Sequence, residues 1–173
     1  MVWTYDAFLR NLRLAGVSDW VIPIVGTSRH AAQRWVGDLR LVFVDGSHEY
    51  EDVKEDFCRW FRLLGNRGVM ALHDSYLCWE GPTKVVEQFL LRDPSAIHVG
   101  FLGSITFCQK GRRSVFSLAR NTFLGLVFRL WPRIVRPGRR RLAFGLSFLL
   151  NATDIESMRM VLWVYRQVVR YAL

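Results

Sequence analysis

The sequence predicts an α/β fold, in which a mainly parallel β-sheet carries helices and is followed by a helical extension. The first observation behind this prediction is a strand–helix–strand pattern between Leu39 and Leu72. The second is a pair of apolar runs, Ile97–Phe101 and Ile105–Gln109, on either side of a short turn that contains glycine. Two such runs joined by such a turn are typical of an antiparallel hairpin.

The third observation is that charge divides the chain into two parts. Residues 1–110 hold 12 Lys and Arg against 13 Asp and Glu, a net charge of −1. Residues 111–173 hold 12 Arg against two acids, a net charge of +10. We therefore predict a near-neutral α/β domain over residues 1–110 and a basic, apolar helical extension over residues 111–173.

The segment before the strand–helix–strand unit is expected to form two helices and one strand. Residues 4–15 should be helical, because their apolar side chains recur every three or four positions. A short strand is expected at Val21–Val25, either at a sheet edge or starting after Pro23, because proline has no N–H to donate. A helix should then cover Arg29–Val36, with Ser28 as its cap.

The strand–helix–strand unit has polar residues directly after both of its strands. The run Leu41–Val44 ends on Asp45, and the run Gly68–Leu72 leads into His73 and Asp74. The helix between them keeps its apolar residues on one face, at Val53, Phe57, Trp60, Phe61 and Leu64. The carboxyl ends of parallel strands lie at one edge of a sheet, which is where ligands bind in open α/β folds.

Four further helices are expected toward the C-terminus. One follows a loop and is capped by Thr83, a second runs from Ser114 to Trp131 and stops at Pro132, and a third covers the apolar stretch Leu142–Leu150. The last has an apolar stripe at Ile155, Met158, Leu162, Tyr165, Val169 and Ala172. The longest uncharged run, Leu142–Thr153, is shorter than the roughly 20 apolar residues that a membrane-spanning helix needs.

The stretch from Val42 to Ser75 resembles the middle of a class I S-adenosylmethionine-dependent methyltransferase, and most of all the small-molecule O-methyltransferase-like group. The matching residues are Asp45, Gly46, His48, Tyr50, Val53, Asp56, Trp60, Leu64, Gly68, His73 and Asp74. A weaker resemblance extends from about Asp6 to Lys110. It implies a Rossmann-like, three-layer sheet that ends in an antiparallel strand pair. By the same resemblance, the first two strands and the glycine-rich cofactor turn are missing, so an N-terminally truncated domain is expected.

The resemblance also implies roles for individual residues. His48 stands where similar enzymes carry the general base that deprotonates an acceptor hydroxyl, although a loop histidine packed on Tyr50 is an equally simple interpretation. Cofactor-binding positions are implied at Gly26, Thr27, Ser28, Asp45 and Gly46. The turn residues among them are also ordinary helix caps.

A divalent metal, Mg or Mn, is implied at Asp45, His73 and Asp74, because related metal-dependent enzymes hold an ion between acids at these two strand ends. Two carboxylates and an imidazole are suitable ligands for Mn or Zn, whereas Mg prefers oxygen alone. The alternative is that both carboxylates only accept hydrogen bonds from loop and helix-start amides.

The function implied is methyl transfer from S-adenosylmethionine to a hydroxyl of a small molecule or sugar. The alternative is an inactive remnant that acts as a partner-docking or membrane-surface module, which the missing glycine-rich turn favours. The arginines of the C-terminal part allow a solvated face, an anionic membrane surface or nucleic-acid binding, the last being the weakest alternative. The apolar stripe of the last helix is expected to pack on the domain or to form a homodimer. We expect a cytoplasmic protein, associated with membrane if the tail binds lipid, because the three cysteines form no CxxC pair and no signal peptide is apparent.

Overall fold

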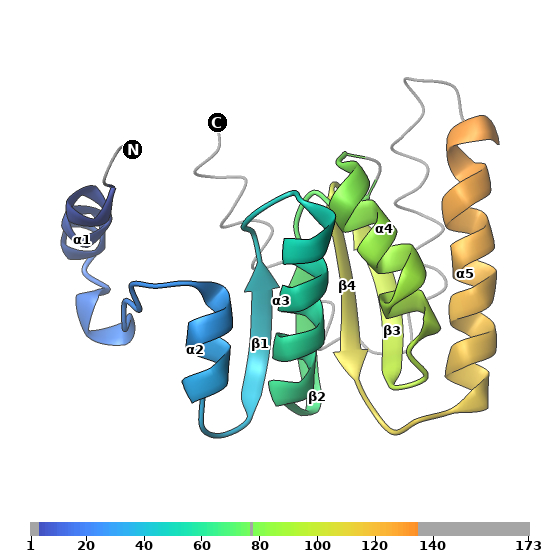
Figure 1. Ribbon diagram of the computed structural model, residues 1–173, viewed down its shortest axis with the longest axis horizontal. Coiled ribbons are helices and arrows are strands. Elements are labelled where there is room, and N and C mark those ends of the chain that lie inside the picture. Colours follow the sequence, from blue (N-terminus) through green and yellow to red (C-terminus); the bar gives the residue numbers. More distant parts are fainter. Residues whose placement is uncertain (1–3, 77, 135–173) are drawn as a thin grey trace. The chain divides into compact units, whose positions relative to one another are not determined.

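The computed structural model describes residues 4–76 and 78–134, which form a mixed α/β structure (Figure 1). The described residues fall into two compact units that divide between Arg34 and Trp35. The elements in chain order are α1 (Tyr5–Leu14), η1 (Ser18–Trp20), α2 (Ser28–Arg34), β1 (Leu39–Val44), α3 (Tyr50–Leu63), β2 (Leu64–Leu72), α4 (Glu80–Gln88), η2 (Leu90–Arg92), β3 (Ala96–Leu102), β4 (Ile105–Lys110) and α5 (Val115–Ile134). The predicted α/β fold class is confirmed.

In the N-terminal unit, the two predicted helices form but the strand does not. The run Val21–Val25 has no regular structure and follows the short helix η1. Pro23 removes a ladder donor from the middle of this run, and β1 pairs with β2 alone among the described strands. The prediction of a strand at Val21–Val25 is therefore wrong.

The second unit is built on a four-stranded sheet with the order β1-β2-β4-β3. Strands β1 and β2 run parallel, whereas β4 pairs antiparallel with both β2 and β3. The expected hairpin and the antiparallel pair at the end of the sheet are confirmed. The sheet as a whole is not mainly parallel. Without the expected strand at Val21–Val25, it contains one parallel pair of strands and two antiparallel pairs.

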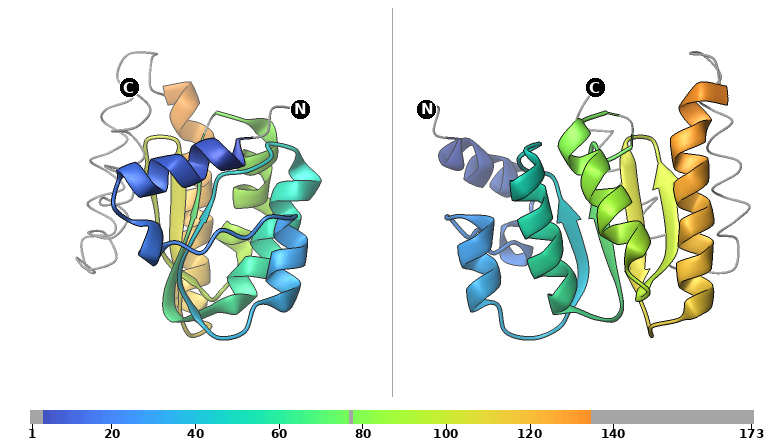
Figure 2. Two further views of the ribbon diagram at one scale, coloured as in Figure 1. Left: turned by 90° about the vertical axis from the view of Figure 1, so that its left-hand side faces the viewer. Right: turned by 45° about the vertical axis from the view of Figure 1, so that its right-hand side comes forward.

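Helices α3 and α4 pack side by side against the sheet, and α5 runs along its β3 end (Figures 1 and 2). The core between helices and sheet contains Val53, Phe57 and Phe61 from α3, Met70 and Leu72 from β2, Val85 and Val86 from α4, and Cys108 from β4. Burying one such side chain stabilises a fold by about 1.5–3 kcal/mol. This core fixes β1 and β2 in the positions from which their polar end residues project.

The amphipathic pattern of α3 is the local cause of this arrangement. Its three buried side chains are spaced four residues apart, so they lie on one face, while the acids Glu51 and Asp52 occupy its first turn. Helix α5 is held differently, by the buried Asn121, whose Nδ2 donates to the carbonyl oxygen of Ala96 at 2.7 Å.

Several boundaries differ from the sequence-based expectations. Helix α4 begins at Glu80 rather than after Thr83, whose N–H already donates to the carbonyl of Trp79 within the helix. Helix α5 continues through Pro132 to Ile134 instead of stopping there. The predicted stretches at Leu142–Leu150 and Ile155–Ala172 lie outside the described residues. Within residues 4–76 and 78–134, none of the helices has the length and apolar character needed to cross a bilayer.

Candidate active site

The parallel register of β1 and β2 brings the polar residues at their ends together. Val44 lies beside Leu72 in the register, and the His73 N–H extends the ladder by donating to the carbonyl of Val44 at 2.9 Å. Asp45 and His73 therefore leave neighbouring strands at the same edge of the sheet. This is the arrangement that the sequence pattern predicts.

His73 lies between two carboxylates. Its Nδ1 is 3.0 Å from Oδ1 of Asp45 and 3.5 Å from Oδ2 of Asp74. The shorter contact is a hydrogen bond when Nδ1 carries the proton, and it becomes an ion pair when the imidazole is fully protonated. The side chain of His73 is 25% exposed and that of Asp45 is 49% exposed, so the pair stands at the surface of the edge.

His48 contacts the other side of the same cluster. Its Nε2 is 3.2 Å from Oδ2 of Asp74, and its ring stacks on Trp79 with centroids 4.5 Å apart and planes only 4° from parallel. With the Nε2 proton donated to the carboxylate, the neutral ring has its lone pair on Nδ1. Nδ1 has no hydrogen-bond partner among the described residues, so it is available to accept a proton from a ligand.

Asp74 connects the two imidazoles because of an unusual backbone conformation. Its φ is +49°, in the left-handed region that aspartate tolerates better than most residues. The next residue, Ser75, is fully buried: its Oγ donates to the carbonyl of Leu72 at 2.7 Å and accepts from the N–H of Thr106 at 3.0 Å. The loop after β2 is thereby tied to β4, which holds the Asp74 carboxylate in place.

The start of α4 supports the loop that carries His48. A Cβ added to Gly81 would lie 2.1 Å from the carbonyl oxygen of His48 and 2.8 Å from the backbone nitrogen of Tyr50. Only glycine allows this close approach of the two backbones. Sequence reasoning missed Ser75 and Gly81, because neither carries a pattern that separates it from an ordinary loop serine or glycine.

The other predicted site residues are placed as follows. Gly46 lies in the loop after β1, next to Asp45, whereas Gly26, Thr27 and Ser28 belong to the N-terminal unit. There Thr27, rather than Ser28, caps α2: its Oγ1 accepts from the N–H of His30 at 3.2 Å. The cofactor roles of these five residues stay predictions.

The predicted metal site does not take the form of a ligand cluster. Within the part of the chain that the structure describes, no group of three or more His, Cys, Asp and Glu side chains is arranged to hold a metal ion. Each of the two carboxylates is instead paired with an imidazole, Asp45 with His73 and Asp74 with His48. The geometry thus fits paired acid–base groups better than a metal centre at Asp45, His73 and Asp74.

Two aromatic residues follow the loops of this site, Tyr50 at the start of α3 and Trp79 directly before α4. Tyr50 starts α3 and its hydroxyl donates to Oε1 of Gln88 at 2.7 Å, so it links α3 to α4. Trp79 stacks on His48 and is 53% exposed, so one part of its surface is open toward the candidate site. The cavity beneath this edge measures only about 10 Å³, so a substrate would have to lie on the open side.

Comparison with known proteins relates this site to a family. Residues 2–75, less than half of the chain, match the model of a family described as a methyltransferase domain. The matched segment contains β1, α3 and β2, together with Asp45, His48, His73 and Asp74. The resemblance to class I S-adenosylmethionine-dependent methyltransferases is thereby confirmed for this segment of the chain.

A solved structure is also similar to the chain: the MycE methyltransferase from the mycinamycin biosynthetic pathway, in complex with Mg, SAH and mycinamycin VI. Identity is 16%, the TM-score is 0.40, and the match covers 51% of this chain and 29% of MycE. The chain thus spans less than a third of the length of that methyltransferase.

Proposed function

We propose that this chain takes part in methyl transfer from S-adenosylmethionine to a hydroxyl of a small molecule or sugar, with His48 as the general base. The observation that carries the proposal is the His48–Asp74 pair, which lies at the carboxyl ends of two parallel strands inside the methyltransferase segment. Ligands of open α/β folds bind at this edge, and an imidazole is a suitable base near neutral pH.

In the proposed reaction, Nδ1 of His48 accepts the proton of the acceptor hydroxyl while the oxygen attacks the methyl carbon. S-adenosylmethionine supplies that methyl group on a positively charged sulfur, and a neutral thioether leaves. The proton ends on the imidazole, and the Asp74 carboxylate at 3.2 Å stabilises the imidazolium that forms. Most of the rate gain in such a displacement comes from holding the reacting groups in line.

Asp45 and His73 lie next to the His48–Asp74 pair. His73 Nδ1 is 3.5 Å from the same Asp74 oxygen that faces His48, so an N–H at this nitrogen would help to fix the orientation of that carboxylate. We assign Asp45 and His73 a positioning role. A divalent ion, Mg or Mn, is the competing hypothesis for these residues and is tested together with the cofactor below.

An inactive, partner-docking module is the second candidate function. Apolar side chains of the N-terminal unit are exposed to an unusual degree: Trp20 by 88%, Ile22 by 87% and Val25 by 60%. Contiguous exposed apolar surface marks interaction sites more often than chance. This candidate predicts that the chain binds no cofactor.

Calorimetric titration of the 173-residue chain with S-adenosylmethionine, with and without Mn²⁺, separates the two candidates. Binding in the micromolar range supports methyl transfer, and turnover would then fall at least about 100-fold in His48→Ala and in Asp74→Asn. Asp52→Asn, an exposed acid in the first turn of α3, is the matched control and should leave turnover unchanged.

Failure to bind S-adenosylmethionine would overturn the enzymatic role of this chain and leave the docking module. Binding that requires Mn²⁺, and is lost in Asp45→Asn, would favour the metal over the paired imidazoles. Co-sedimentation of the whole chain with anionic vesicles tests whether such a docking module binds a membrane surface.

A further inference from the structure

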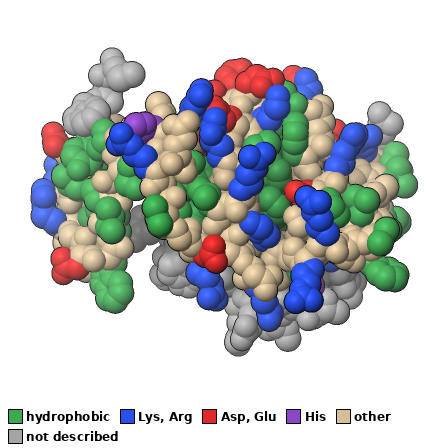
Figure 3. Space-filling view, turned by 60° about the horizontal axis from the view of Figure 1, so that its bottom comes forward, with side chains coloured by type: hydrophobic (Ala, Val, Ile, Leu, Met, Phe, Trp, Pro, Cys, Tyr) green, Lys and Arg blue, Asp and Glu red, His purple; other side chains and the backbone are tan. Residues whose placement is uncertain are grey.

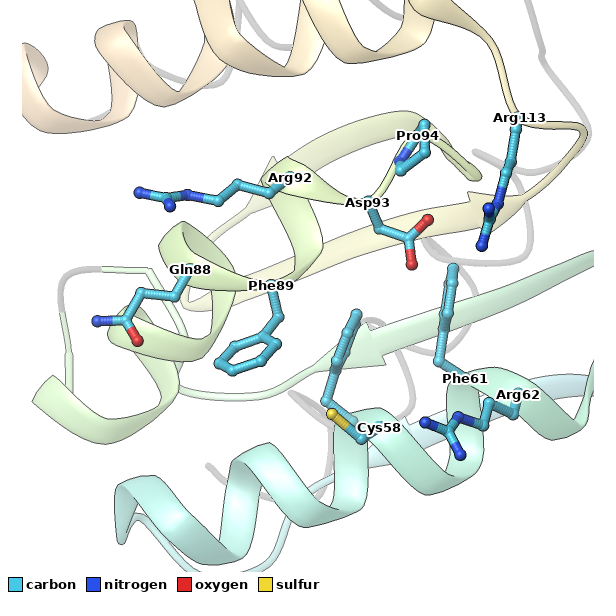
Figure 4. A pocket seen from close by; sticks show the side chains of 10 residues that line it. Cys58, Phe61, Arg62, Gln88, Phe89, Arg92, Asp93, Pro94 and Arg113 are labelled. Atoms are coloured by element: carbon cyan, nitrogen blue, oxygen red, sulfur yellow. The ribbon is translucent and has the colours of Figure 1, made fainter.

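A larger cavity, of about 350 Å³, lies away from the strand ends. It is formed by the second half of α3, by the end of α4 with the segment that follows it as far as Pro94, and by Arg113 after β4 (Figure 4). None of its lining residues belongs to the cluster of His48, His73 and their carboxylates. It is therefore a separate feature of the second unit.

One wall of this cavity is aromatic. Phe57 and Phe61 stack in parallel on α3 with ring centroids 5.2 Å apart, and Phe89 lies 6.5 Å from Phe57 at the end of α4. Phe57 and Phe61 are packed into the core, whereas Phe89 is only half-buried. The rings are held rigidly by this packing, so they offer a preformed apolar surface.

The rim of the cavity is basic. Arg62, Arg92 and Arg113 line it, all three are exposed, and none forms an ion pair with an acid of residues 4–76 or 78–134. Other arginines of the same surface are paired: Arg59 with Glu55, and Arg129 with Glu87. The guanidinium N–H groups of the three rim arginines are therefore available to bind a ligand.

Among the described residues, Asp93 is the one acid that lines the cavity, against three arginines. The Asp93 carboxylate accepts hydrogen bonds from the backbone N–H of Ser95, at 2.8 Å, and from its hydroxyl. Figure 4 shows Arg113 extending toward Phe61 from the segment after β4, with Asp93 between Arg113 and Arg92. On the face seen in Figure 3, many Lys and Arg side chains lie among apolar ones.

We propose that this cavity binds a small amphipathic anion, namely a phosphate or carboxylate group carried on an aromatic or short alkyl body. Guanidinium groups bind such anions through paired N–H donors, and the phenylalanine wall would take the apolar body. A volume of about 350 Å³ lies within the range of small-molecule sites. This inference does not depend on the proposed methyl transfer.

Cys58 lies in the cavity wall and provides a reporter. Of the three free cysteines, Cys108 is fully buried, Cys78 is exposed and Cys58 is half-buried. The full chain with Cys78→Ser therefore has Cys58 as its accessible thiol. Phenyl phosphate should slow the alkylation of Cys58 by iodoacetamide in a saturable way. Titration calorimetry with phenyl phosphate gives a second readout that does not depend on this thiol.

The rim arginines allow a matched pair of variants. Arg113→Gln should weaken binding of phenyl phosphate by about tenfold or more, because a charge-assisted contact is lost. Arg112→Gln removes the same charge from the neighbouring exposed residue, which does not line the cavity, and should change the affinity by less than about twofold. Equal losses in the two variants, or no protection and no heat of binding, would overturn the proposal.

Two further probes test the apolar wall and the source of the anion. Inorganic phosphate should bind more weakly than phenyl phosphate, and equal affinities would overturn the amphipathic part of the inference. Protection of Cys58 by vesicles of phosphatidylcholine with phosphatidic acid, sensitive to Arg113→Gln, would assign the anion to a lipid headgroup. Protection by phenyl phosphate alone would assign it to a free small molecule.

Discussion

At the scale of single residues, the candidate site depends on what each ring nitrogen faces. His48 has Asp74 on Nε2 and an indole on its face, so in the proposed reaction its remaining nitrogen, Nδ1, accepts the proton. His73 has carboxylates near its Nδ1 instead, which suits orientation rather than proton transfer. We therefore propose different roles for the two histidines because their partners differ, whereas the resemblance implied a general base at His48 and a metal ligand at His73.

Tyr76, which follows the same loop, gives a pH dependence. Burial raises the pKa of the Tyr76 phenol above its usual value of 10.0, and its ring stacks on Phe101 at 5.0 Å. The neutral phenol is therefore favoured in the folded state. The resulting stabilisation is complete below the unfolded-state pKa and is lost as pH rises from there through the higher pKa of the folded protein.

We expect Tyr76→Phe to reduce the alkaline fall in the free energy of unfolding. The measurement is urea denaturation of both proteins at about pH 8 and at about pH 11. The difference in the free energy of unfolding between the two pH values should be smaller in Tyr76→Phe than in the parent chain. A constant offset caused by the lost hydroxyl does not affect this comparison. Identical falls in both proteins would contradict this assignment. Burial also raises the pKa of the Cys108 thiol, so a residual alkaline fall is expected in Tyr76→Phe.

At the scale of elements, the site depends on contacts between segments far apart in sequence. The loop after β2 is tied to β4 by Ser75, and the loop after β1 rests on the first turn of α4 at Gly81. Both contacts are made by backbone atoms or a short hydroxyl, so small changes in these segments should be transmitted to His48 and Asp74.

Gly81→Ala is expected to destabilise the protein by about 1–3 kcal/mol, because its Cβ would overlap the His48 carbonyl and force the two segments apart. The matched control is Gly125→Ala in α5, where, among the described residues, the new Cβ would meet only Leu91 Cδ1, at 3.4 Å. That change should be neutral or stabilise the helix by up to about 1 kcal/mol. Urea denaturation of the three proteins compares them, and equal stability of Gly81→Ala and the parent chain would refute the close contact.

At the scale of the whole molecule, the two compact units are unequal. The clusters that form the core of the sheet contain no residue from the first 34 positions, and they extend from Leu39 to Leu124. The second unit therefore has a complete core of its own, whereas no residue of α1 is buried. Because a domain's stability comes mainly from burial of apolar surface, the second unit should be the independently stable part.

We expect residues 35–173 expressed alone to unfold cooperatively, with a urea midpoint close to that of the full chain. Circular dichroism and tryptophan fluorescence during urea denaturation provide the measurement. If this shorter chain unfolds without a cooperative transition, the first 34 residues contribute to the core in a way that the two-unit division does not describe.

The sequence by itself determined the α/β class, the strand–helix–strand unit, the hairpin and the set of polar residues at the strand ends. These depend on local periodicity and on the parallel direction of β1 and β2, both of which can be read along the chain. Tertiary structure decided which side chains pair: His48 with Asp74, and His73 with Asp45. It also decided the support from Ser75 and Gly81, the absence of a strand at Val21–Val25, and the basic cavity beside α3. Each of these depends on segments brought together by core packing, and the distances between such segments are not set by sequence spacing.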